Sequence, residues 1–208
     1  MASRIRHHVN PLALHLLAFE PERPVLDGRP VHVELGCAEG EFLFRFASAH
    51  PEALVVGVEI RRELVQEIQD TARAMGLFPR VQAVFANIPI HLHLLFPENS
   101  VTRFYLNFPD PCFKRDQHKR RVLTPGVLQD IHRALVPGGE FFFQSDIFDT
   151  ALDALYVTER YAPAGFENVL ESFRFLREHP FAGTPTRRER FCAEEGVRIW
   201  RFCYRKSS

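Results

Sequence analysis

Two acidic residues in this chain stand where they could bind a ligand. The stretch ELGCAEG places Glu34 just before Gly36 and Gly40, two glycines that allow a tight turn and a close backbone approach to a ligand. Glu59 ends a second apolar stretch, ALVVGVEI, at a position where an acid can bridge the hydroxyl groups of a ribose. The pair therefore indicates a nucleoside cofactor.

The glycine turn also limits which nucleoside cofactor would fit. The turn does not match the GxGxxG dinucleotide fingerprint, because Ala38 occupies the position of the second glycine. This mismatch disfavours a nicotinamide dehydrogenase. The acid Glu34 inside the turn disfavours a pyrophosphate and suits a cationic ligand. S-adenosylmethionine, which carries a sulfonium and an amino group and no phosphate, meets both conditions.

A third acid lies in the stretch YLNFPDP, residues 105–111. Pro109 and Pro111 restrict the backbone on either side of Asp110, so its position is fixed with little entropy left to lose. A Pro-Asp-Pro turn alone is common on surfaces, but the carboxyl end of an apolar strand favours a functional acid. Asn87, after the third apolar stretch, fits a cofactor contact and a polar turn residue equally well.

Positive charge is local rather than global in this sequence. Lys+Arg and Asp+Glu are both 26, so the formal net charge is zero. A basic block directly follows the Pro-Asp-Pro turn, and further basic residues occur near the N-terminus and at 187–190. We expect these clusters to form a rim that binds phosphates. The members of the rim are Arg4, Arg6, His7, His8, Lys114, Arg115, His118, Lys119, Arg120, Arg121, Arg187, Arg188 and Arg190.

The elements that must position these residues alternate between strands and helices. This pattern predicts an α/β fold with a mostly parallel, doubly wound sheet, whose ligand lies at the carboxyl ends of the strands. The predicted strands are 31–36, 53–60, 80–87, 101–108, 140–146 and a late one within 196–206. The predicted helices are 39–50, 61–75, 124–139, ending in a Pro-Gly-Gly turn, and 149–162.

The remaining segments are expected to belong to one domain of 208 residues. Residues 1–25 are predicted to form a basic arm and a short helix, and 177–195 a loop. No apolar stretch is long enough to span a membrane, so the cytosol is the expected location. The four cysteines lack CxxC spacing, which predicts reduced thiols, and no histidine pattern predicts a metal site.

Taken together, these motifs resemble the tRNA (guanine-N7)-methyltransferase family over nearly the whole chain. The most specific of them is NFPDP followed by a basic HKRR. The resemblance implies a class I methyltransferase fold, Rossmann-like with a seven-stranded sheet, that methylates a guanine in the variable loop of tRNA with S-adenosylmethionine. The matching stretches are RIRHHVNPL (4–12), VELGCAEGEF (33–42), VGVEI (56–60), YLNFPDP (105–111), HKRR (118–121), VPGGEFFFQSD (136–146) and TRRERF (186–191).

The resemblance also implies roles for individual residues. Asp110 would be the catalytic acid, stabilising the positive charge that develops on the methylated base. Asp146 would orient the base, and Thr186 and Glu189 would close the site. The implied cofactor-binding residues are Glu34, Gly36, Gly40, Glu59, Asn87 and Asp110. The implied substrate-binding residues are Lys114, Arg115, His118, Lys119, Arg120, Arg121, Asp146, Thr186 and Glu189.

The chain departs from the family pattern mainly in the loop after Asp110. Cys112-Phe113 replaces the usual Trp-Pro, Arg115-Asp116-Gln117-His118 replaces a basic and His-rich segment, and Ala38 replaces a common glycine. Two alternatives stay open, and the altered loop motivates the first of them. One is a methyltransferase of the same fold with another RNA target site, and the other is a non-catalytic RNA-binding paralogue.

Overall fold

The computed structural model describes residues 9–112, 120–181 and 183–208. The strands within these ranges are β1 (Val31–Leu35), β2 (Leu54–Glu59), β3 (Val81–Phe85), β4 (Val101–Asn107), β5 (Leu135–Ser145), β6 (Phe166–Asn168) and β7 (Trp200–Lys206). The helices are the 3-10 helix η1 (Leu14–Leu16) and the α-helices α1 (Glu41–Ala49), α2 (Arg62–Ala74), α3 (Ile88–Leu95), α4 (Pro125–Ala134), α5 (Phe148–Tyr161) and α6 (Arg187–Glu194).

The described strands form one seven-stranded sheet in the order β3-β2-β1-β4-β5-β7-β6. The pairs from β3 through β5 are parallel, and β7 runs antiparallel to both β5 and β6. The predicted seven-stranded, mostly parallel sheet is therefore confirmed. The strand order reverses direction at β1 and β4, so their carboxyl ends flank the crevice where such folds bind ligands.

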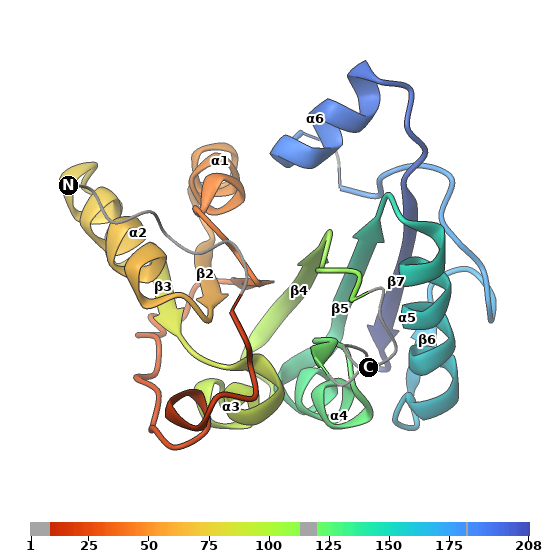
Figure 1. Cartoon of the computed structure of the whole chain (residues 1–208), viewed down its shortest axis with the longest axis horizontal. Coiled ribbons are helices and arrows are strands. Elements are labelled where there is room, and N and C mark those ends of the chain that lie inside the picture. Colours follow the sequence, from red (N-terminus) through yellow and green to blue (C-terminus); the bar gives the residue numbers. More distant parts are fainter. Residues whose placement is uncertain (1–8, 113–119, 182) are drawn as a thin grey trace.

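Helices cover both faces of the sheet (Figure 1). One apolar cluster joins α3, α4 and α5 to the sheet, and a second joins α1 and α2 to the opposite face. The interior strands are apolar on both faces because each face is covered. Helix α6 belongs to neither layer, since it lies at the end of the sheet toward which β4 and β5 point (Figure 1).

The N-terminal segment packs along the edge strand β3. Gln82 exchanges two hydrogen bonds with the backbone of Val25, and the ring of Phe19 stacks on Phe85 with centroids 4.6 Å apart. Leu16 of η1 is buried. The helix within this segment, η1, is shorter than the one predicted from the apolar residues. The segment as a whole packs against the edge strand, which protects that edge from pairing with another chain.

Four elements differ from the sequence prediction. The segment 177–195 was predicted to be a loop, but α6 occupies 187–194, and its capping box, Thr186 with Glu189, is a sequence signal for a helix start. Helix α4 ends at Ala134 rather than before Gly139, because Pro137 disfavours helical geometry at the residue before it and β5 already begins at Leu135. Helix α3 and strand β6 were not predicted.

We expect Gly57→Ala to destabilise the protein, since a Cβ at Gly57 would lie 2.4 Å from the Cys37 sulfur and 2.6 Å from a Leu43 methyl carbon. Separating α1 from β2 should lower the free energy of unfolding by about 1–3 kcal/mol, measured by urea denaturation. Gly126→Ala in α4 is the matched control, because among the described residues the nearest atom to its Cβ would be one of Thr124, at 3.9 Å. An equal loss in both variants, or in neither, would contradict this packing.

Candidate active site

The centre of the site is the carboxylate of Glu34, at the carboxyl end of β1. Glu34 is 5% exposed, and its Oε1 accepts a hydrogen bond of 2.8 Å from the Asn107 side-chain amide at the end of β4. Its second oxygen, Oε2, is buried and has no hydrogen-bond partner within the described part of the chain. A buried carboxylate oxygen without a donor is costly, so this atom is suited to a ligand that donates a proton or carries positive charge.

Burial raises the pKa of Glu34 from 4.5 to about 8. The hydrogen bond from Asn107 lowers it, whereas the charges of Glu59 and Glu189 raise it further. Desolvation dominates because a carboxylate loses the favourable hydration that its neutral form does not need. A cation placed at Glu34 would offset that loss and favour the ionised form.

The turn between β1 and α1 has the conformation that its glycines predict. Gly36 and Gly40 have positive φ angles of 80° and 74°, and Ala38 between them adopts a φ of 49°. Among the described residues, apart from its chain neighbours, no atom lies within 4 Å of where a Cβ on Gly36 would stand, whereas one on Gly40 would lie 2.8 Å from Ile68 of α2. Gly36 thus leaves the backbone open, and Gly40 serves the contact between helices.

Glu59, at the end of β2, holds this turn in place. Its carboxylate accepts hydrogen bonds from the backbone amides of Ala38, Ile60 and Arg61 at 2.9–3.0 Å. The Arg61 guanidinium donates two more, at 2.8 and 3.1 Å. For Glu59 to bridge ribose hydroxyl groups, the Arg61 side chain would have to yield its bonds, and the backbone amides could stay in place.

Asn87 occupies the N-cap position of α3 without a side-chain capping bond, and it ties the N-terminal segment to the sheet. Its side-chain amide donates to the carbonyl oxygen of Pro11 at 2.7 Å and lies 3.4 Å from that of Leu16. Its backbone N–H donates to the ring nitrogen Nδ1 of His91 at 3.0 Å. The NH₂ group of Asn87 therefore holds the N-terminal segment against the sheet. The side-chain oxygen of Asn87 is the atom that would contact a cofactor.

A chain of hydrogen bonds crosses the site from β1 to α6. Asn107 Oδ1 accepts from Gln144 at 2.9 Å, and Gln144 accepts from Arg201 at 3.1 Å. Arg201 also reaches Glu189 of α6 at 3.4 Å. Sequence reasoning missed Gln144 and Arg201. A glutamine inside the apolar strand FFFQS was the available signal, because a buried polar side chain needs partners.

Helix α6 is anchored over this end of the sheet by its own side chains. Thr186 and Glu189 form a reciprocal capping box, with the Thr186 N–H donating to Glu189 at 2.7 Å and the Glu189 N–H to Thr186 at 3.1 Å. Arg188 forms an ion pair with Asp146 at the end of β5, and Arg190 forms one with Glu41 of α1. Arg188 and Arg190 thus bind the helix to the site.

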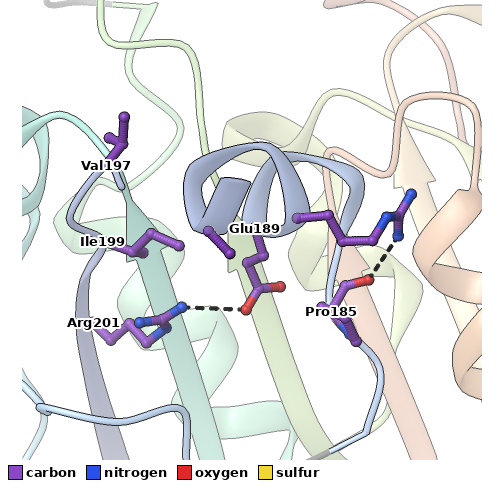
Figure 2. Close-up of a pocket in the computed structure, with 7 residues that line it drawn as sticks. Pro185, Glu189, Val197, Ile199 and Arg201 are labelled. Atoms are coloured by element: carbon purple, nitrogen blue, oxygen red, sulfur yellow. Dashed lines mark hydrogen bonds and ion pairs between the residues drawn. The ribbon is translucent and has the colours of Figure 1, made fainter. Parts of the chain in front are cut away.

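A cavity of about 340 Å³ lies beside α6, with Glu189 and Arg201 in contact with it (Figure 2). Val197 and Ile199 form its apolar side, and Pro185 lies at the opposite side (Figure 2). The cavity therefore combines an apolar wall with one acid and two arginines, Arg190 and Arg201.

The Pro-Asp-Pro elbow leaves β4 through strained backbone. Phe108 and Cys112, on either side of it, both adopt a φ of 48°, which costs a side-chain-bearing residue of the order of 1–3 kcal/mol. Asp110 is exposed on the elbow and borders a small cavity with Arg121. Arg121 is held 2.6 Å from Asp153 of α5. The elbow therefore has a defined shape at the carboxyl edge of the sheet.

Some predicted residues fall outside the described ranges. Lys114, Arg115, His118 and Lys119 belong to residues 113–119, and Arg4, Arg6, His7 and His8 to residues 1–8. Among residues 9–112, 120–181 and 183–208, no three His, Cys, Asp or Glu side chains gather as metal ligands. Within those ranges no helix has the length and apolarity needed to cross a lipid bilayer.

All four cysteines are free thiols, as predicted.

We expect Glu34→Gln to stabilise the protein at alkaline pH. The pKa of Glu34 is about 8 in the folded protein and 4.5 ordinarily, so the folded state holds a proton that the unfolded state has lost. The ionisation of Glu34 therefore lowers the stability of the wild type as the pH rises from 4.5 to about 8. The variant should gain free energy of unfolding on the order of 3–5 kcal/mol above pH 8 and little at pH 4, measured by urea denaturation. Exposed Glu67→Gln is the control and should show no such pH dependence. A gain that does not vary with pH would contradict the buried carboxylate.

Comparison with known proteins shows the fold and the family of the chain. The methyltransferase family model Methyltransf_4 matches residues 28–202. In fold, the chain is similar to the 16S rRNA methyltransferase KamB, with a TM-score of 0.59 and 18% identity over 86% of this chain and 88% of that one. It is also similar to TrmN from Thermus thermophilus, with a TM-score of 0.56 and 20% identity over 86% of this chain and 45% of that one.

Similarity in sequence is closer to a narrower group of proteins. The tRNA (guanine-N(7)-)-methyltransferase of Synechocystis sp. (strain ATCC 27184 / PCC 6803 / Kazusa) is 38% identical over 91% of this chain and 90% of its own length. The protein of the same name from Synechococcus sp. (strain JA-3-3Ab) is 34% identical over 97% of this chain and 85% of its own length. With matches of this extent, the chain belongs to the tRNA (guanine-N7)-methyltransferase family.

Proposed function

We propose that this protein transfers a methyl group from S-adenosylmethionine to N7 of a guanine in the variable loop of tRNA. The observation that carries the choice of a cationic cofactor is the buried Glu34 carboxylate at the carboxyl end of β1, whose oxygen Oε2 lacks a donor among the residues described. Family membership supports the reaction type, since the relatives named above are tRNA (guanine-N(7)-)-methyltransferases.

The residues of the site fit this cofactor. A buried acceptor such as Glu34 Oε2 suits the ammonium group of a methionine moiety, and the acid Glu59 suits ribose hydroxyl groups. The open backbone at Gly36 leaves room beside the turn. An acid at this turn would repel a pyrophosphate. When bound, S-adenosylmethionine supplies an electrophilic methyl group on a positively charged sulfur.

The chain's own residues have a positioning and an electrostatic task in this reaction. Guanine N7 carries a lone pair and needs no base to remove a proton, so alignment of the base is the main requirement. The base becomes cationic on methylation, and the carboxylate of Asp110, fixed between two prolines, would stabilise that charge. Asp146 would accept from the amino edge of the guanine once Arg188 turns away from it.

The basic residues would bind the tRNA backbone. Three arginines form ion pairs with carboxylates of the protein itself, namely Arg121, Arg188 and Arg190. Phosphates of the tRNA could replace those carboxylates as partners of the guanidinium groups. Lys114 and the other cations of residues 113–119 extend the same rim in sequence. We propose that the whole chain acts as one domain in this task and that it works in the cytosol, where tRNA is found.

We expect Asp110→Asn to lower the rate constant for methyl transfer to a tRNA transcript by about a hundredfold, because it removes a charge that stabilises the cationic product. The affinity for tRNA should change by less than about twofold, since the substitution adds no repulsion to phosphates. The measurement is single-turnover transfer of a radiolabelled methyl group, followed by nucleoside analysis of the product. Asp27→Asn, on the loop before β1, is the matched control and should behave like the wild type.

The product analysis separates the alternatives. 7-Methylguanosine at one position of the variable loop supports the proposal. A different methylated nucleoside or position would identify another RNA target, and tRNA binding without transfer would identify a non-catalytic protein. Full activity of Asp110→Asn would reject the role of that acid and leave the reaction itself standing.

A further inference from the structure

The hydrogen bonds between Arg201 and Glu34 all run in one direction. Arg201 donates to Gln144 at 3.1 Å, Gln144 donates to Asn107 at 2.9 Å, and Asn107 donates to Glu34 at 2.8 Å. The three side chains lie on adjacent strands in register, since Asn107 pairs with Gln144 and Gln144 with Arg201. The hydrogen bonds from Arg201 to Asn107 therefore follow from the strand pairing, and the last one reaches Glu34 on the neighbouring strand β1.

The direction is set by the two ends. A guanidinium can only donate hydrogen bonds, and an ionised carboxylate can only accept them. Facing Arg201, Gln144 must present its oxygen, so its NH₂ group turns to Asn107. Asn107 must then present its own NH₂ group to Glu34. If Arg201 were absent, both amides could rotate by half a turn, and Asn107 could place an oxygen against the Glu34 carboxylate.

Arg201 has a second contact on the side of α6. Its Nη2 lies 3.4 Å from Oε1 of Glu189, and both side chains border the cavity beside the helix (Figure 2). Glu189 in turn caps the helix through Thr186. One guanidinium thus joins the amide chain that ends at Glu34 to the first turn of the helix that covers the site.

We propose that Arg201 is a positioning residue for methyl transfer: it orients Gln144 and Asn107 so that Glu34 keeps one oxygen for the cofactor, and it holds α6 in place for the substrate. This inference rests on the proposed function. Arg205, on the same strand, shows the ordinary alternative, because it bonds directly to the carboxylate of Glu140 at 2.7 Å. The Nε group of Arg201 instead donates to the neutral amide of Gln144. An arginine with a purely structural role would pair directly with a carboxylate, as Arg205 does.

The electrostatic surroundings of Glu34 make this orientation matter. Glu59 from β2 and Glu189 from α6 both raise the pKa of Glu34, and burial raises it most. The Asn107 hydrogen bond lowers the pKa. Losing that bond should therefore require a higher pH before Glu34 ionises and binds a cation.

The test compares three full-length variants with the wild type. Arg201→Met removes the donor at the head of the chain. Gln144→Glu keeps a partner for Arg201 and the size of the side chain, but replaces the donor to Asn107 by an acceptor. Arg205→Met is the matched control on the same strand. Each protein is measured for its melting temperature, for its Kd for S-adenosylmethionine by calorimetry from pH 6 to 9, and for kcat and KM with tRNA.

For Arg201→Met we expect about tenfold weaker cofactor binding at pH 7, the size of one lost hydrogen bond to a charged group. The pH at which binding reaches its plateau should rise, and KM for tRNA should increase as well. Gln144→Glu should weaken cofactor binding similarly and leave KM for tRNA within about twofold, because its contact with α6 through Arg201 persists. Arg205→Met should leave all of these values within about twofold.

Two results would overturn the inference. One is a folded Arg201→Met whose cofactor Kd and pH dependence match those of the wild type. The other, decisive even if Arg201→Met fails to fold, is a Gln144→Glu variant with wild-type cofactor binding. If the wild type itself does not bind S-adenosylmethionine, the proposed function falls together with this inference, whereas equal binding by wild type and variants removes this inference alone.

Discussion

The structure of the site depends on keeping one carboxylate, Glu34, inside the protein. Burial raises its pKa to about 8, so the folded chain bears a cost for this acid at neutral pH and above. The Asn107 amide offsets part of that cost through a direct hydrogen bond. Asn107 is in turn held by Gln144, and the order of β1, β4, β5 and β7 is what places these side chains next to one another.

The parts around this carboxylate are rigid for reasons that can be named. Three residues other than glycine take left-handed backbone angles in the turns after β1 and β4, namely Ala38, Phe108 and Cys112. Such strain persists only where neighbouring contacts hold it, and Glu59 supplies one of those contacts through the Ala38 amide. Above them, α6 is tied to α1 and β5 by two ion pairs. These strained residues lower the stability of the folded protein and give one edge of the sheet a defined geometry.

Much of the fold and part of the site could be predicted from the sequence. Apolar stretches with regular spacing predicted β1 to β5 and four of the helices, and the rule for parallel sheets correctly placed Glu34 and Glu59 at strand ends. The Glu34–Asn107–Gln144–Arg201 chain could not be predicted, because it depends on the register of strands up to 167 residues apart in number, from 34 to 201. Nor could a count of arginines show that Arg188 and Arg190 would pair with Asp146 and Glu41.

We propose that Glu34 is kept buried to bind a cation on the cofactor. The most direct test is a calorimetric titration of S-adenosylmethionine into wild type and Glu34→Gln at pH 8.5. We expect a folded variant that binds the cofactor about a hundredfold more weakly, because a buried charge pair is lost. Equal affinity of the two proteins would contradict it.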